Sequence, residues 1–179
     1  MKIGIDVGGT KCLGVAIDDN GKVVQQFRLP TPHADELCNT LIEIVAQLGE
    51  ATSLGIGVPG LISPEGVIRA SPNLVGAKEL PLRQMLEEQL GKRVLVENDA
   101  TCAALGEWKL GAAQGATDAW VITLGTGIGG GFIAGSVLQR GAHGFAGEVG
   151  HMVVDPDGPL CPCGRNGCWE RYASGKGLS

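Results

Sequence analysis

The chain has 179 residues, which is enough for one domain of ordinary size and part of a second. Fourteen Lys and Arg residues stand against 19 Asp and Glu residues, and the formal net charge of −5 comes without any basic block, so a nucleic-acid or anionic-lipid partner is not expected. The apolar runs are far shorter than the ~20 residues that a membrane-spanning helix needs, and the first residues hold an acid and no long apolar run, so no secretory signal is expected. We therefore expect a cytoplasmic protein without a membrane or nucleic-acid partner.

The start of the chain predicts an antiparallel meander of three strands. Apolar and polar residues alternate over 2–7, 12–17 and 22–29, which is the pattern of half-buried strands. The Asn-Gly pair between the second and third strands is a strong hairpin signal, because both residues adopt positive φ readily. A helix is expected next over residues 35–48, where apolar side chains recur at helical spacing.

Strand and helix patterns then alternate, which predicts a mixed α/β domain. Strands are expected over 54–58 and 93–97, and helices over 82–90 and 100–110. Residues 61–81 are rich in Gly, Pro and Ser, so we expect a loop excursion that is too polar to join the core and that can carry binding residues.

A change in composition over residues 111–118 marks a domain boundary. Two more strands, 119–124 and 130–138, follow around a glycine turn and repeat the pattern that opens the chain. We therefore expect an N-terminal α/β domain over 1–115 and an incomplete second α/β domain over 116–179. Little structure is expected after the last cysteine, so the chain is expected to be truncated relative to a two-domain protein.

The first chemical motif is DVGGTK, a strand end followed by a two-glycine turn into the next strand. The backbone N–H groups of Gly8 and Gly9 can approach phosphate oxygens, with the Thr10 hydroxyl and the Lys11 charge beside them. Asp6 can orient a hydrated Mg²⁺ ion. The alternative is a plain hairpin in which Asp6 accepts hydrogen bonds from the turn amides.

The second motif begins at Gly125, continues through Thr126 and Gly127, and contains the G-x-G-x-x-G pattern of dinucleotide-binding proteins. That pattern must open a helix, whereas the residues that follow here are β-branched and broken by glycine. We therefore interpret the motif as a second glycine hairpin, which together with the first could hold a polyphosphate. A flexible hairpin without a ligand is the alternative.

The third motif is VENDA, where a strand passes into a helix at Asp99. The commonest role of an acid at this position is to cap the helix. Ligands also bind at the carboxyl ends of strands in open α/β sheets, and there an Asp can act as a base toward a hydroxyl group. The local sequence does not distinguish the two roles.

The fourth motif is the strongest, because it holds a complete set of zinc ligands: one imidazole and three thiolates. These ligands are His151, Cys161, Cys163 and Cys168. A site closed by four protein ligands is structural rather than catalytic, and unliganded buried cysteines or a disulfide are the alternatives. Glu148 and Glu170 flank the ligands, so the metal would hold both carboxylates near one place. For either acid alone, a solvated surface position is the default.

In this order the motifs resemble the ROK family of bacterial sugar kinases and sugar-responsive repressors, with glucokinase as the most similar type. DVGGTK is similar to the first phosphate loop of that family, LGTGIGGG to the second, ENDA to the catalytic loop, and GEVGH with CPCGRNGCWE to the zinc segment. The resemblance implies the actin-like, ribonuclease H-like ATPase fold, in which a mixed sheet with flanking helices is followed here by the start of a second similar domain.

The resemblance also implies a reaction, the ATP-dependent phosphorylation of a hexose 6-hydroxyl, with glucose as the expected substrate. Asp99 would be the general base. The residues implied in hexose binding are Asn73, Asn98, Glu148, His151 and Glu170. The residues implied in holding the ATP phosphates and Mg²⁺ are Asp6, Gly8, Gly9, Thr10, Lys11, Gly125, Thr126 and Gly127. Zinc would be structural, and the whole protein would be a homodimer.

Other functions stay open beside this one. N-acetylmannosamine, N-acetylglucosamine and fructose are alternative substrates of the same class. A sugar-responsive repressor would carry a helix-turn-helix before the first glycine turn, whose motif starts here at residue 6, so catalysis is favoured over sensing. A non-catalytic fragment that binds sugar or zinc is the third alternative, and we expect the 179-residue chain alone to lack useful kinase activity.

Overall fold

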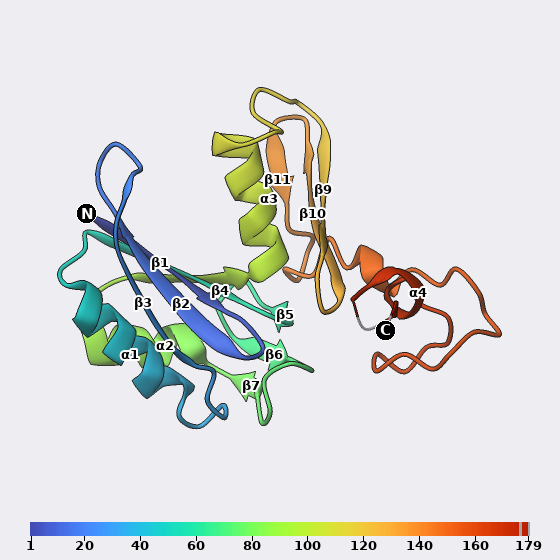
Figure 1. Ribbon diagram of the computed structural model, residues 1–179, viewed down its shortest axis with the longest axis horizontal. Helices are drawn as coiled ribbons and strands as arrows, with labels where there is room; N and C mark the ends of the chain where they lie inside the picture. Colours follow the sequence, from blue (N-terminus) through green and yellow to red (C-terminus); the bar gives the residue numbers. More distant parts are fainter. Residues whose placement is uncertain (176, 179) are drawn as a thin grey trace. The chain divides into compact units, whose positions relative to one another are not determined.

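The computed structural model describes residues 1–175, 177 and 178, drawn as a ribbon in Figure 1. The chain forms two compact units, Met1–Asp99 and Ala100–Ser179, and each is described by itself. The domain division after residue 115 stays a prediction. Among the described residues, none of the helices combines the length and the apolar character needed to span a bilayer.

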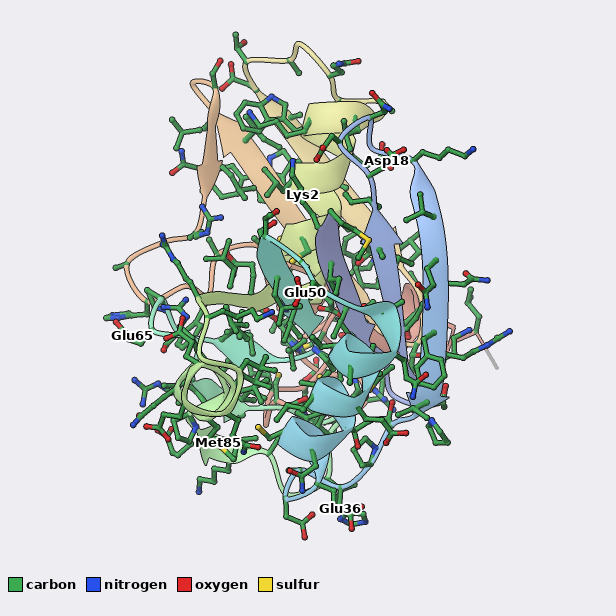
Figure 2. The ribbon with its side chains drawn as sticks, turned by 90° about the vertical axis from the view of Figure 1, so that its left-hand side faces the viewer. Lys2, Asp18, Glu36, Glu50, Glu65 and Met85 are labelled. Carbon is green, nitrogen blue, oxygen red and sulfur yellow. The ribbon has the colours of Figure 1, made fainter. Side chains whose placement is uncertain are left out.

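The first unit is built on a five-stranded sheet with the strand order β3-β2-β1-β4-β8. Its strands are β1 Lys2–Val7, β2 Lys11–Ile17, β3 Val23–Pro30, β4 Ser53–Val58 and β8 Val94–Asn98. The first three pair antiparallel, which confirms the predicted meander, whereas β4 runs parallel to β1 and β8 runs parallel to β4. Asp18 closes the β2–β3 turn by accepting a hydrogen bond of 2.9 Å from the N–H of Asn20, and Figure 2 shows Asp18 at this turn.

Two helices pack against this sheet. α1 Leu37–Leu48 contacts β1, β2 and β3, and α2 Leu82–Leu90 contacts β8 and α1. Figure 1 shows both helices on the same side of the strands, and the alternate apolar side chains of β1 are buried in the same core as α1. A Cβ atom added at Gly14 on β2 would overlap Cγ2 of Ile44, so the helix approaches the sheet closely because glycine stands there.

Residues 61–81 differ from the prediction of a polar loop outside the core. They form a small antiparallel sheet, with the order β5-β6-β7. Its strands are β5 Leu61–Ile62, β6 Ile68–Ala70 and β7 Lys78–Leu80. The exposed fractions of Ile62, Ile68 and Leu74 are 1%, 0% and 1%, so these residues belong to the core of the first unit. The prediction was wrong because a few apolar residues, widely spaced among Gly, Pro and Ser, show no period.

The second unit holds a three-stranded sheet, with the order β11-β10-β9, and one long helix. Its elements are α3 Asp99–Leu110, β9 Ala119–Leu124, β10 Ile128–Ala134, β11 Val137–Gln139, the 3₁₀ helix η1 Val149–His151 and α4 Glu170–Ala173. The helix packs on β10 through small residues, since a Cβ atom added at Gly131 would lie 2.6 Å from Cβ of Ala104. The predicted strand 130–138 is divided in two, because Gly135 and Ser136 form a turn with φ of 57° and 61°.

Candidate functional site

Three parallel strands of the first unit end at the same edge of its sheet. The register pairs Asp6 with Gly57 and Gly57 with Glu97, and it pairs Val58 with Asn98. The first glycine turn, the turn after β4 and the residue after β8 therefore lie at one edge. The carboxyl ends of parallel strands are where ligands bind in open α/β sheets.

The first glycine turn is stabilised by a hydrogen bond within it and by two hydrogen bonds from Thr31. Within it, the N–H of Gly8 donates a hydrogen bond of 2.9 Å to the carbonyl of Lys11. Thr31, which follows β3, donates its hydroxyl to the Gly8 carbonyl over 2.6 Å and its N–H to the Thr10 carbonyl over 3.1 Å. The sequence does not single out Thr31, because the prolines beside it indicate only the end of a strand. Pro30 pairs with Lys11 at the start of β2. A hydroxyl residue next to Pro30 is therefore the sequence signal that could identify Thr31 as a neighbour of the turn.

Asp6 and Lys11 lie at the two ends of this turn. Partial loss of hydration raises the pKa of Asp6, and the positive charge of Lys11 acts in the opposite direction. A Cβ atom added at Gly9 would lie 3.9 Å from Cβ of Asn73, so Asn73 lies beside the turn. A carboxylate, an ammonium group and the N–H of Gly9 at one turn are a suitable set for phosphate oxygens and a hydrated cation.

Asn98 ties the predicted base to the backbone of the turn after β4. Its side-chain amide donates a hydrogen bond of 3.1 Å to the carbonyl of Gly60 and another of 3.1 Å to Oδ1 of Asp99. Gly60 has a φ of 111°, and a Cβ atom there would overlap the carbonyl oxygen of Ala70, so only glycine fits. The structure makes Asp99 the first residue of α3 and leaves Asn98 nearly buried, with an exposed fraction of 9%.

In the second unit, the four predicted zinc ligands lie together. The ligand atoms of His151, Cys161, Cys163 and Cys168 all lie within 4.8 Å of one another. The Sγ atoms of Cys163 and Cys168 are 3.5 Å apart, too far for a disulfide, and Sγ of Cys161 is 3.6 Å from Nδ1 of His151. Zn–S bonds of about 2.3 Å and Zn–N bonds of about 2.0 Å separate tetrahedral ligands by roughly 3.5–3.8 Å. The four residues therefore fit a zinc ion.

Two glycines let the chain between the cysteines fold back on itself. Gly164 has a φ of 90° and Gly167 a φ of 62°. The N–H of Gly164 donates to the Cys161 carbonyl over 2.9 Å, and the N–H of Cys161 donates to the Arg165 carbonyl over 2.8 Å. At Gly167, a Cβ atom would overlap the carbonyl oxygen of Asp155. These bonds bring the sulfur atoms together through the backbone alone.

Two carboxylates flank the His151 ring. Nε2 lies 3.8 Å from Oε2 of Glu148, and Nδ1 lies 3.6 Å from Oε1 of Glu170. The Cys161 thiol donates to the same oxygen of Glu170 over 3.3 Å. Burial first, and then this hydrogen bond, raise the pKa of Cys161 to about 12, and a zinc ion bound to the sulfur would favour loss of the proton. Glu148, His151 and Glu170 thus share one small region.

The second glycine turn lies beside the same region. The N–H of Gly125 donates to the Gly127 carbonyl over 3.0 Å, and the N–H of Gly175 donates to the Gly125 carbonyl over 2.8 Å. A Cβ atom at Gly127 would lie 2.9 Å from Oε2 of Glu170, so the turn and α4 are in contact. A strand, β10, follows the turn at Ile128, so the motif lacks the helix of a dinucleotide-binding fingerprint.

The structure brings the predicted residues together in two groups, one in each unit. The first group is Asp6, Gly8, Gly9, Thr10, Lys11, Asn73, Asn98 and Asp99. The second group is Gly125, Thr126, Gly127, Glu148, His151, Cys161, Cys163, Cys168 and Glu170. Each group combines a glycine turn with the polar side chains that the motifs predict.

The sequence matches one protein family and is similar to several sugar kinases. The ROK family model matches residues 2–179. A glucokinase from Streptomyces coelicolor is 42% identical over 183 residues, which are 99% of this chain and 57% of that protein. An N-acetylmannosamine kinase from Shigella boydii is 38% identical, over 99% of this chain and 62% of that protein. The chain therefore spans about three fifths of the length of these relatives.

A solved structure supports the same assignment of fold. The ROK family glucokinase from Streptomyces griseus, in complex with glucose and AMPPNP, superimposes with a TM-score of 0.90 at 42% identity. The match covers 99% of this chain and 58% of that one. It confirms the predicted α/β fold of the actin-like, ribonuclease H-like ATPase class.

Proposed function

Because this chain belongs to the ROK family, we propose that the whole protein transfers the γ-phosphoryl group of ATP to the 6-hydroxyl of a hexose, with glucose as the first candidate. The observation that carries the proposal is the hydrogen-bonded pair Asn98–Asp99 at the sheet edge that also holds the first glycine turn. This reaction needs a base that accepts the hydroxyl proton and groups that bind the phosphates of ATP. The 42% identity with a glucokinase makes glucose the first candidate.

In the proposed reaction the sugar oxygen attacks the γ-phosphorus, and the bond from that phosphorus to the bridging oxygen breaks. ADP leaves with the electron pair, and the hydroxyl proton passes to the carboxylate of Asp99. The transition state of phosphoryl transfer is loose, so catalysis is mostly alignment of the reactants and neutralisation of charge. The Gly8 N–H is already bonded to the Lys11 carbonyl, so the N–H of Gly9 and the ammonium group of Lys11 would supply that positive field, and Mg²⁺ when bound supplies more.

The hexose hydroxyl groups would be bound by polar side chains. These are Asn73, Asn98, Glu148, His151 and Glu170. Zinc would be held by the four ligands of the cysteine cluster and would act structurally, since it has no open coordination position. His151 turns Nδ1 toward Cys161 and Nε2 toward Glu148, so metal binding at Nδ1 leaves the other nitrogen available for a sugar hydroxyl.

The test is steady-state turnover of the whole protein with ATP and a panel of glucose, N-acetylmannosamine, N-acetylglucosamine and fructose. We expect the highest kcat/KM with glucose and a product phosphorylated at the 6-hydroxyl. The 38% identity with an N-acetylmannosamine kinase makes that sugar the rival. Glucose binding without turnover would instead support a non-catalytic, sugar-sensing role. The homodimeric state stays a prediction, which light scattering of the whole protein would check.

A further inference from the structure

Thr31 is attached to both sides of the first glycine turn. Its hydroxyl donates to the carbonyl of Gly8 over 2.6 Å, and its N–H donates to the carbonyl of Thr10 over 3.1 Å. The same hydroxyl lies 3.7 Å from Sγ of Cys12, which is fully buried. Inside the turn the Gly8 N–H donates to the Lys11 carbonyl, but the two glycines have no side chains to pack.

A bond to the Gly8 carbonyl also sets the direction of the next N–H group. The carbonyl of Gly8 and the N–H of Gly9 belong to one planar trans peptide unit, so they point in opposite directions. With the carbonyl held by Thr31, the Gly9 N–H points away from Thr31. Glycine alone would let this peptide unit rotate, since its φ and ψ are weakly restricted.

The surroundings of Thr31 keep its own donors in place. Pro30, the last residue of β3, precedes it, and Pro32 follows it. A residue before proline is restricted to extended conformations, and the β-branched Thr side chain has few χ1 rotamers. The N–H and hydroxyl of Thr31 therefore need little further ordering to reach the turn.

We propose that Thr31 is a positioning residue that, through the Gly8 carbonyl, aims the Gly9 N–H group at a phosphate of the nucleotide. The inference rests on the proposed function, because it takes the first glycine turn as a phosphate-binding site. Thr31 itself does not contact the phosphate in this proposal, and it acts only through the peptide unit that it holds.

The test uses the chain itself and inorganic tripolyphosphate with Mg²⁺, so it needs neither turnover nor an adenosine site. Amide signals of Gly8, Gly9, Thr10 and Lys11 are followed by NMR during the titration. Thr31→Val keeps the shape but removes the hydroxyl, and Thr31→Ser restores a hydroxyl without the methyl group. We expect Thr31→Val to raise the dissociation constant about 3- to 10-fold, the value of one hydrogen bond, and Thr31→Ser to stay within about twofold of the native chain.

The control is Thr52→Val, which removes a similar hydroxyl bond of 3.0 Å, to the Met1 carbonyl, away from the turn. We expect this variant to bind as the native chain does. Hydrogen exchange gives a second readout without ligand: the Gly9 amide should exchange faster in Thr31→Val and not in Thr52→Val. If Thr31→Val does not fold, Thr31→Ala is used in its place.

Two outcomes would overturn the inference in different ways. Native affinity and native Gly9 exchange in Thr31→Val would refute the positioning role and leave the proposed function standing. No shift of the turn amides in the native chain at millimolar tripolyphosphate would refute phosphate binding by this turn, and with it the proposed function and the role of Thr31.

Discussion

The side-chain amide of Asn98 donates a hydrogen bond of 3.1 Å to the carboxylate of Asp99. The same amide group donates to the carbonyl of Gly60, so the direction of the carboxylate depends on a residue 38 positions before Asn98 in the chain. These two bonds hold the Asp99 carboxylate in one orientation, which the proposed role as a base requires.

Replacing Asp99 by Asn should remove the proton acceptor and keep the shape. We expect kcat of the whole protein to fall about 10²- to 10⁴-fold, while the hexose KM changes little. Steady-state kinetics with ATP and glucose measure both values. Glu50→Gln, on an exposed acid just after α1 that Figure 2 labels, is the control and should keep native kcat. A kcat within a few-fold of native in Asp99→Asn would rule out the base assignment.

Glu148 lies 3.8 Å from Nε2 of His151, on the side away from the cysteine cluster. Glu148→Gln replaces a charged hydrogen-bond acceptor by a neutral amide, so we expect the hexose KM to rise about tenfold, as charged hydrogen bonds contribute about 1.5–3 kcal/mol. The ATP KM should not change. Titration of each substrate at saturation of the other separates the two values. An equal rise in both would count against a sugar contact.

Cys163→Ser removes one of four zinc ligands. Zinc measured by atomic absorption should fall from about one ion per chain to near zero, and limited proteolysis should cut within residues 145–170. Chelation of zinc from the native chain should open the same segment. Cys102→Ser, outside the cluster, is the control and should keep its zinc. Native zinc content and an uncut segment in Cys163→Ser would contradict a structural metal.

Gly14→Ala tests the close packing of α1 on the sheet. The new Cβ atom would overlap Ile44 and lie 2.8 Å from Cδ1 of Leu48, so we expect the free energy of unfolding to fall by about 1–3 kcal/mol. Gly55→Ala is the matched control, because it also lies in a strand of the same sheet but has no atom within 4 Å of the added Cβ. Urea denaturation gives both values. Equal free energies of unfolding for the two variants would show that the core around Gly14 rearranges to accept the added methyl group.

The periodic parts of the fold could be predicted from the sequence, and the aperiodic parts could not. The meander, α1, α2 and β8 follow from apolar residues at regular spacing, and their observed bounds differ from the predicted ones by a residue or two. Ile62, Ile68 and Leu74 reach the core from an irregular segment, so no spacing marks them. Their burial depends on tertiary packing that only the folded chain specifies.

The candidate site divides in the same way. The cysteine cluster is visible in the sequence because its ligand types and glycine spacing are rare, and the structure places its ligand atoms together. Thr31 is invisible, because its role comes from bonds to backbone carbonyls that exist only once β2 and β3 have paired. The link between Asn98 and Gly60 likewise needs the parallel pairing of β4 and β8.

The two glycines between Cys163 and Cys168 restrict which positions of this loop can carry other residues. Gly167 cannot gain a side chain without striking Asp155, while Gly164 has open space but a backbone angle that favours glycine. Arg165 and Asn166 are both exposed at the tip between them. A fluorescent label placed at either position would therefore lie outside the cysteine cluster, and it could report loss of zinc without occupying a ligand position.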